Sequence, residues 1–148
     1  MSRFFTLTRL YAAMALLGLL GVLDSLYLTV EHYRGKSVIC LTGAGCDAVL
    51  QSSYATIAGI LPVAMLGLAY YLAVFFLSSY AALHRFELAR YAAARIPIVG
   101  FMASVWFVYL QVFQIRAICA WCMVSAVLSV VLLAIGLSII FREGGDNG

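Results

Sequence analysis

Two cysteines separated by two residues, in the segment Ile118-Cys119-Ala120-Trp121-Cys122-Met123, are the side chains of this sequence best suited to chemistry. Cysteines at positions i and i+3 share one face of a helix, so their sulfurs can form a disulfide or act in turn on one substrate. At a helix start, free backbone N–H groups and the positive end of the dipole favour a thiolate. A Cys-x-x-Cys pair in this position indicates thiol–disulfide exchange, and nearby Arg116 adds a positive charge.

The same pair has a simpler interpretation, because free cysteines are often small apolar residues buried in a core. A c-type haem attachment site is disfavoured, because it needs a histidine after the second cysteine and Met123 occupies that position. The motif alone therefore leaves redox chemistry and simple burial both open.

The helices that position the dithiol follow from the apolar run between Ile96 and Phe141. As one straight helix this run would be roughly twice as long as a membrane core, which is about 30 Å thick. It must therefore fold back, and the polar side chains of Gln111, Gln114 and Arg116 place the turn at about residues 114–117. The dithiol then opens the second of two antiparallel helices, at the membrane surface.

Composition predicts an all-α integral membrane protein. Hydrophobic residues make up 66% of the 148 residues and charged residues 10%, against roughly 45–50% and 25% in a soluble domain. The net charge of +3 gives no indication of nucleic-acid binding. We expect a single domain over residues 1–148, a four-transmembrane-helix bundle without a fused thioredoxin-like domain, with helices at about 10–30, 57–80, 96–113 and 118–141.

A second cysteine pair, Cys40 and Cys46, lies in the longest polar segment, from Glu31 to about Thr56, between the first and second helices. The glycines between the two cysteines permit the turns that would bring the thiols together. A short helix is expected to begin at Cys46 and end near Leu50.

The distribution of charge predicts which side each loop faces. The two termini and the connection over residues 81–95 share one side, which holds six of the nine basic residues: Arg3, Arg9, Arg85, Arg90, Arg95 and Arg142. The positive-inside rule assigns that side to the cytoplasm. All four cysteines then lie on the opposite, periplasmic or extracellular face of the cell (inner) membrane, where an oxidising environment suits a disulfide relay.

Two polar residues of the first helix allow more than one interpretation. Asp24 lies inside the span, where a carboxyl group is costly and should face the bundle interior. It either reaches interfacial water, or serves as a proton relay or polar contact in an active cavity. His32, at the end of the span, is interpreted as an interfacial polar residue rather than a metal ligand.

Four pieces between Gly18 and about Leu133 occur in a specific order along the chain. They are Asp24-Ser25-Leu26-Tyr27-Leu28-Thr29 with His32-Tyr33, the loop pair Cys40-x5-Cys46, Cys46-Asp47-Ala48-Val49-Leu50-x-Ser52-x-Tyr54-Ala55, and Ile118-Cys119-x-x-Cys122. With these pieces the chain resembles the vitamin K epoxide reductase family in its bacterial, stand-alone form. One difference lies before the second helix, where the family has Gly-x-Pro and this chain has Gly59-Ile60-Leu61-Pro62, which affects the expected cavity lining near Pro62 and Val63.

The resemblance implies a quinone-dependent thiol–disulfide oxidoreductase that supports disulfide formation in secreted proteins. In the family pattern Cys40 exchanges with a thioredoxin-like (DsbA-like) extracytoplasmic partner, Cys46 passes electrons to Cys119, and Cys122 faces and reduces the quinone. Because the sequence stops at Gly148, the partner is expected to be a separate protein. The acceptor is expected to be ubiquinone, menaquinone or a vitamin K type quinone.

A quinone site should be apolar and aromatic with few polar groups. Trp106, Tyr109 and Phe113 recur at helical spacing, Trp121 lies within the dithiol motif, and Ser52 occupies a loop position that family members use near the ring. Each aromatic residue could instead anchor the protein at the membrane interface or pack inside the bundle.

Three other functions compete with this one. A DsbB-type quinone reductase also has four helices and two cysteine pairs, but its Cys-x-x-Cys belongs to the first outer loop. A small membrane structural or assembly protein would use the cysteines for stabilising disulfides. A zinc site is disfavoured by the oxidising face and by the x5 spacing of Cys40 and Cys46.

Overall fold

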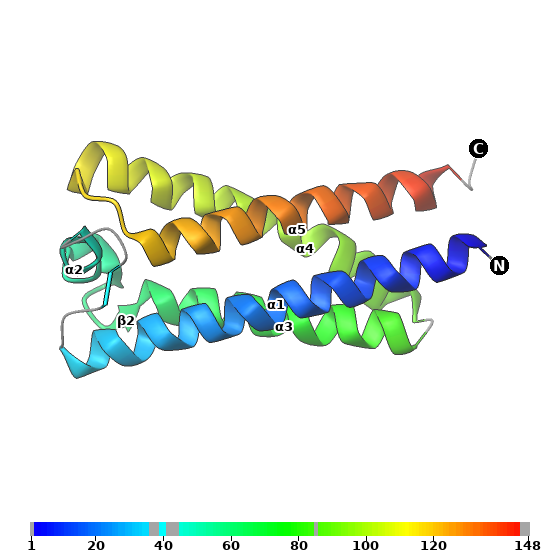
Figure 1. The fold of residues 1–148 in the computed structure, drawn as a ribbon, viewed down its shortest axis with the longest axis horizontal. Helices are drawn as coiled ribbons and strands as arrows, with labels where there is room; N and C mark the ends of the chain where they lie inside the picture. Colours follow the sequence, from blue (N-terminus) through cyan, green and yellow to red (C-terminus); the bar gives the residue numbers. More distant parts are fainter. Residues whose placement is uncertain (1, 36–38, 41–44, 85, 146–148) are drawn as a thin grey trace.

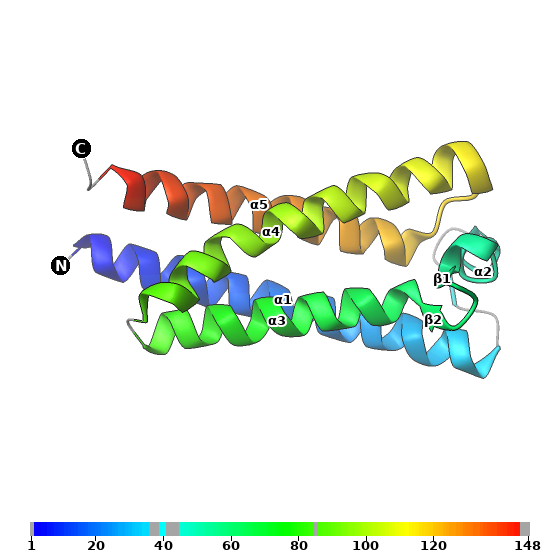
Figure 2. The same cartoon turned by 180° about the vertical axis from the view of Figure 1, so that it is seen from behind.

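The computed structural model of the protein describes residues 2–35, 39–40, 45–84 and 86–145. Figures 1 and 2 show that its long helices form an elongated bundle. Four helices within the described residues are long and apolar enough to cross a membrane, which confirms the expected all-α membrane fold. They are α1 (Ser2–Arg34), α3 (Val63–Leu83), α4 (Glu87–Tyr109) and α5 (Ala120–Gly144).

The two ends of the bundle differ in what they carry. The beginning of α1 and the end of α5 lie together at one end (Figure 1). The opposite end carries α2 (Gly45–Leu50), a 3-10 turn (Ser53–Ala55) and a small hairpin of β1 (Thr56–Ile57) and β2 (Leu61–Pro62). The start of α5 lies at this second end, so the fold gathers the cysteine-bearing elements there.

The second membrane helix begins at Val63, six residues later than the expected start near residue 57. The intervening chain forms the β1–β2 hairpin, whose turn contains Ala58 and Gly59 at positive φ angles of 54° and 72°. A helix cannot continue through such backbone angles. Pro62 then caps α3, where its missing N–H costs nothing.

The third membrane helix begins at Glu87, earlier than the expected start at Ile96. Most of the basic segment over residues 81–95, expected to be a connection, is therefore helical. Alanine is the strongest helix former, and Ala89, Ala93 and Ala94 are buried against the rest of the bundle. At its other end α4 continues as a π-helix over Leu110–Ile115.

The core consists of two helix pairs, with α1 packed mainly on α3 and α4 mainly on α5. Small residues allow close approach, because a Cβ atom at Gly21 would overlap the ring of Tyr71. Polar side chains satisfy one another between the helices. The Tyr71 hydroxyl lies 2.7 Å from the Ser125 hydroxyl, and the Ser104 hydroxyl donates to the Ser129 hydroxyl at 2.9 Å.

Candidate active site

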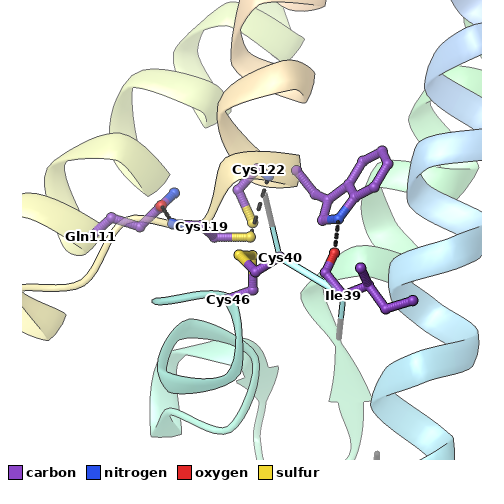
Figure 3. The surroundings of a disulfide bond; sticks show 7 residues. Ile39, Cys40, Cys46, Gln111, Cys119 and Cys122 are labelled. Atoms are coloured by element: carbon purple, nitrogen blue, oxygen red, sulfur yellow. Dashed lines mark hydrogen bonds between the residues drawn. A yellow bond between two sulfur atoms is a disulfide. The ribbon is translucent and has the colours of Figure 1, made fainter. Parts of the chain in front are cut away.

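The Cys119–Cys122 dithiol opens α5, as its sequence position predicts. After the π-helix, Arg116 adopts a left-handed conformation with φ of 55°, which redirects the chain toward α5. Cys119 is the N-cap residue, and its sulfur accepts a hydrogen bond from the backbone N–H of Cys122 at 3.3 Å. The backbone N–H of Cys119 donates to the Gln111 side-chain oxygen at 2.9 Å (Figure 3). The buried Gln111 therefore holds the segment that precedes the dithiol.

The surroundings of Cys119 favour its thiolate form. A hydrogen bond with the Cys122 thiol is the largest cause that lowers the pKa of Cys119 below its ordinary value. The backbone N–H groups of Cys122 and Trp121 lower this pKa further, while burial opposes them. The exposed Arg116, expected to contribute a positive charge, is not among the causes.

The loop cysteines form a disulfide, Cys40–Cys46, with their Cα atoms 5.9 Å apart. The short helix α2 begins at Gly45, one residue before the predicted start at Cys46, and Cys46 is fully buried together with Cys119 in one apolar cluster. Cys40 and Cys122 pack against this cluster, so all four cysteines meet at one end of the bundle. Figure 3 shows the disulfide facing the Cys119 sulfur. Cys119 and Cys122 themselves are free thiols.

Trp121 connects the dithiol to the cysteine-bearing loop. Its indole N–H donates to the backbone oxygen of Ile39, next to Cys40, at 3.0 Å. Its ring packs on that of Tyr27 in α1, with 5.2 Å between the ring centroids. Trp121 therefore positions the loop and does not line the cavity beside the dithiol.

A cavity of about 330 Å³ lies between the four membrane helices and beneath the loop. Its size and mainly apolar walls suit a small aromatic ligand. Cys122 lies in its wall and Ser52 lines its loop side, where the Ser52 hydroxyl donates to the Val49 carbonyl at 2.7 Å. The polar residues among those that line it are Asp24, Ser25, His32, Ser52, Tyr54, Tyr70, Tyr71, Ser104, Gln111, Ser125 and Ser129.

Three of the aromatic residues expected near a quinone lie on a different face. Trp106, Tyr109 and Phe113 stack along α4 and its π-helical extension, with ring centroids 5.9 and 5.0 Å apart. Trp106 and Phe113 are 59% and 63% exposed, and none of the three lines the cavity. The cavity is lined instead by the opposite face, with Phe107 and Gln111. Helical spacing identifies which residues share a face but not which face turns inward.

The cavity also contains residues that the sequence did not assign to a site. Gln111 was interpreted only as part of a polar turn, yet its side chain holds the dithiol and lines the cavity. Tyr70 and Tyr71 had no distinguishing sequence signal, because tyrosine is common in membrane helices near the interface. Asp24 differs from these residues, because an acidic side chain within an apolar span is unusual and the sequence already allowed a role for it in an active cavity. Asp24 lines the cavity.

Comparison with known protein families matches residues 12–137 to the Vitamin K epoxide reductase family. This match covers most of the chain. The chain belongs to the Vitamin K epoxide reductase family. A comparison with curated proteins gives no match.

Membership of the Vitamin K epoxide reductase family implies a membrane thiol–disulfide oxidoreductase linked to a quinone. The family generally acts with a thioredoxin-like partner. The residues present fit a quinone, because an apolar cavity of suitable size has a thiol of the dithiol in its wall.

Proposed function

We propose that this protein is a thiol oxidase that reoxidises a thioredoxin-like (DsbA-like) partner and passes two electrons to a membrane quinone. The observation that carries the proposal is the meeting of the Cys40–Cys46 disulfide with the free Cys119 and Cys122 thiols, beside a cavity that Cys122 lines. A quinone bound in this cavity supplies the two-electron acceptor.

The cysteines act in the order of their access. Cys40 is partly exposed and Cys46 is buried, so a partner thiolate attacks Cys40 and releases the Cys46 thiol. When Cys119 and Cys122 are joined in a disulfide, the Cys46 thiolate attacks Cys119, its neighbour in the buried cluster, and releases the Cys122 thiolate. The second thiolate of the partner's own cysteine pair attacks the partner sulfur of the mixed disulfide, which releases the oxidised partner and frees the Cys40 thiolate. Cys40 then attacks Cys46, restores the Cys40–Cys46 disulfide and releases the Cys119 thiolate. Cys119 and Cys122 are left reduced, with Cys122 next to the cavity.

The surroundings of the Cys119–Cys122 pair weigh against a purely structural role for the cysteines. A stabilising crosslink needs no reactive sulfur. Instead, Cys119 lies at a helix start that favours its thiolate, which is the form that exchanges with disulfides.

The orientation that we propose places both termini in the cytoplasm and the cysteines at the periplasmic or extracellular face of the cell membrane. The charge distribution supports it. After reduction of intact cells, a membrane-impermeant thiol reagent should label Cys40 from outside. Labelling of the four cysteines only after the membrane is broken would contradict this orientation.

Turnover by the purified protein tests the function. Reduced thioredoxin-like protein is supplied with ubiquinone, menaquinone or vitamin K type quinones in short-chain form, and quinol formation is followed. Replacing each of Cys40, Cys46, Cys119 and Cys122 by alanine should abolish turnover, while the exposed Ser138→Ala should retain it. Full turnover by Cys119→Ala and Cys122→Ala would rule out the relay.

Mass spectrometry of Cys46→Ala tests the order of transfer. When this variant is incubated with the oxidised partner, the Cys40 thiolate attacks the partner's disulfide. Without Cys46 the mixed disulfide cannot be converted into the loop disulfide, so it should accumulate on Cys40. Partner adducts that form only on the helix cysteines would reverse the assigned roles.

A further inference from the structure

Asp24 is the one acidic side chain that lines the cavity in the part of the chain that the structure describes. The residue is only 7% exposed, and neither carboxyl oxygen has a hydrogen-bond partner among the described residues. A buried polar group is normally hydrogen-bonded, so an unpaired carboxyl group in a cavity wall is positioned to interact with a molecule bound in the cavity. Because an unpaired carboxylate is costly in apolar surroundings, the neutral acid, which carries a proton, is the form that this site favours.

The surroundings of Asp24 place it with the dithiol. Cys122 at the start of α5 and Tyr71 of α3 line the same cavity as Asp24. The other titratable side chains among the described residues that line it are His32, Tyr54 and Tyr70, and the Tyr70 hydroxyl likewise has no hydrogen-bond partner there. The nearby Tyr71 hydroxyl is already engaged by Ser125 at 2.7 Å, so it does not pair with the carboxyl group.

Quinone reduction needs two protons as well as two electrons. When the Cys119–Cys122 disulfide forms, the two sulfurs lose two electrons in total, and the Cys122 thiol releases one proton. Cys119 brings no proton when it reacts as a thiolate, the form that its hydrogen bonds favour. One of the two protons of the quinol must then come from another group.

We infer that Asp24 is this group, donating the second proton to the quinone from the wall of the cavity. The inference rests on the proposed function. In the balanced step, the Cys119 thiolate, the Cys122 thiol, the Asp24 carboxylic acid and the quinone give the disulfide, the quinol and the Asp24 carboxylate. After the quinol leaves, the carboxylate takes a proton from water that enters from the outer face. His32, two helical turns from Asp24 on the same face of α1, lines the cavity toward that face.

Variants of Asp24 and of one control residue separate proton donation from ligand binding. Asp24→Asn keeps a hydrogen-bond donor but cannot give up a proton, whereas Asp24→Leu removes both functions. Ser78→Ala is the matched control, because Ser78 is also buried with no hydrogen-bond partner within the described part of the chain but does not line the cavity. Two readouts are used, namely binding of ubiquinone-1 to the oxidised protein by calorimetry and single-turnover reduction of ubiquinone-1 by the pre-reduced protein.

For Asp24→Asn we expect quinone binding within about threefold of wild type and a rate of quinone reduction lower by roughly 100-fold, the usual contribution of a positioned acid. The remaining rate should fall as the pH rises, because the proton then comes from solvent. Asp24→Leu should lose both binding and rate, Asp24→Glu should recover part of the rate, and Ser78→Ala should retain both.

Reduction by Asp24→Asn at the wild-type rate, with unchanged binding, would overturn the inference while leaving the proposed function intact. Failure of the wild-type protein to reduce any quinone would instead overturn the proposed function, and the role of Asp24 with it. Oxidised wild-type and variant proteins should show the same thermal unfolding, which excludes misfolding as the cause of a lost rate.

Discussion

The sulfur of Cys119 is surrounded by groups that decide its reactivity. The Cys122 thiol and two backbone N–H groups at the start of α5 stabilise its negative charge, and Gln111 holds the preceding backbone in place. A thiolate is the attacking species in disulfide exchange, and a thiol with a lowered pKa is also a better leaving group. This arrangement therefore suits a cysteine that must receive and release a disulfide partner in turn.

Removal of the Cys122 thiol should raise the pKa of Cys119, because its hydrogen bond is the largest cause of the lowering. The measurement follows the thiolate absorbance of Cys119 as the pH rises, in a C40A/C46A background. The pH at the midpoint of this rise should be lower in the protein that keeps Cys122 than in Cys122→Ala. Cys122→Ser, which keeps an O–H donor, should give an intermediate midpoint. Equal midpoints in the alanine and serine variants would contradict the assigned cause.

Gln111→Leu should destabilise the site, because it leaves the buried N–H of Cys119 without its acceptor. Loss of such a partner typically costs about 1–3 kcal/mol of unfolding free energy. The free energy of unfolding in detergent measures the loss, and turnover with quinone should fall as the segment before the dithiol loosens. The exposed Gln114→Leu is the matched control and should change neither quantity.

At the scale of elements, the meeting of the two cysteine pairs depends on how α2 packs against the connection before α5. A Cβ atom at Gly45, the first residue of α2, would overlap the carbonyl oxygen of Ile118, the residue before Cys119. Only glycine permits this approach. The hydrogen bond from Trp121 to Ile39 secures the other side of the same loop.

Gly45→Ala should therefore push α2 away from Ile118 and slow electron transfer from Cys40 and Cys46 to Cys119 and Cys122. We expect the rate of internal disulfide exchange to fall by about tenfold or more, because misplacement of reacting groups by about 1 Å can cost 100-fold. Rapid-quench thiol trapping after addition of the reduced partner measures this rate. Gly144→Ala, where a Cβ atom would meet nothing, is the matched control.

At the scale of the whole molecule, one end of the bundle carries stabilising contacts between helices and the other end carries the cysteines. The end opposite the cysteines is held by Arg90, whose guanidinium donates to Glu143 at 2.8 Å, linking α4 to α5. The Tyr11 hydroxyl of α1 donates to the same carboxylate at 3.3 Å. These partly buried contacts hold the helices together at the end without cysteines. Disulfide exchange and ligand entry are proposed at the opposite end.

Glu143→Gln should lower the free energy of unfolding by about 1.5–3 kcal/mol, the scale of a hydrogen bond to a charged group. Single-turnover quinone reduction should stay unchanged, because the dithiol lies at the other end. The exposed Arg142→Gln serves as the control for the loss of a nearby charge. A large drop in the reduction rate of Glu143→Gln, without loss of folded protein, would show that the two ends are coupled.

Part of this site could be predicted because its signals are local. The Cys-x-x-Cys motif at Cys119, the short helix at Cys46 and the apolar runs each depend on neighbouring residues. The start of α3 was misplaced because the hairpin before it depends on positive φ angles at Ala58 and Gly59. The start of α4 was misplaced because buried alanines, rather than the apolar run alone, extend the helix.

The sequence by itself determined the four spans and the four cysteines, since span length and cysteine spacing are properties of the chain. Only the tertiary structure decided which side of α4 turns inward, so that Gln111 lines the cavity and Trp106 does not. It also decided that Asp24 lines the cavity and that its carboxyl group has no hydrogen-bond partner among the residues that the structure describes. The physical reason is that a membrane helix is apolar on all sides, so hydrophobic periodicity does not mark its inward face. That face is selected by how well it packs against the neighbouring helices.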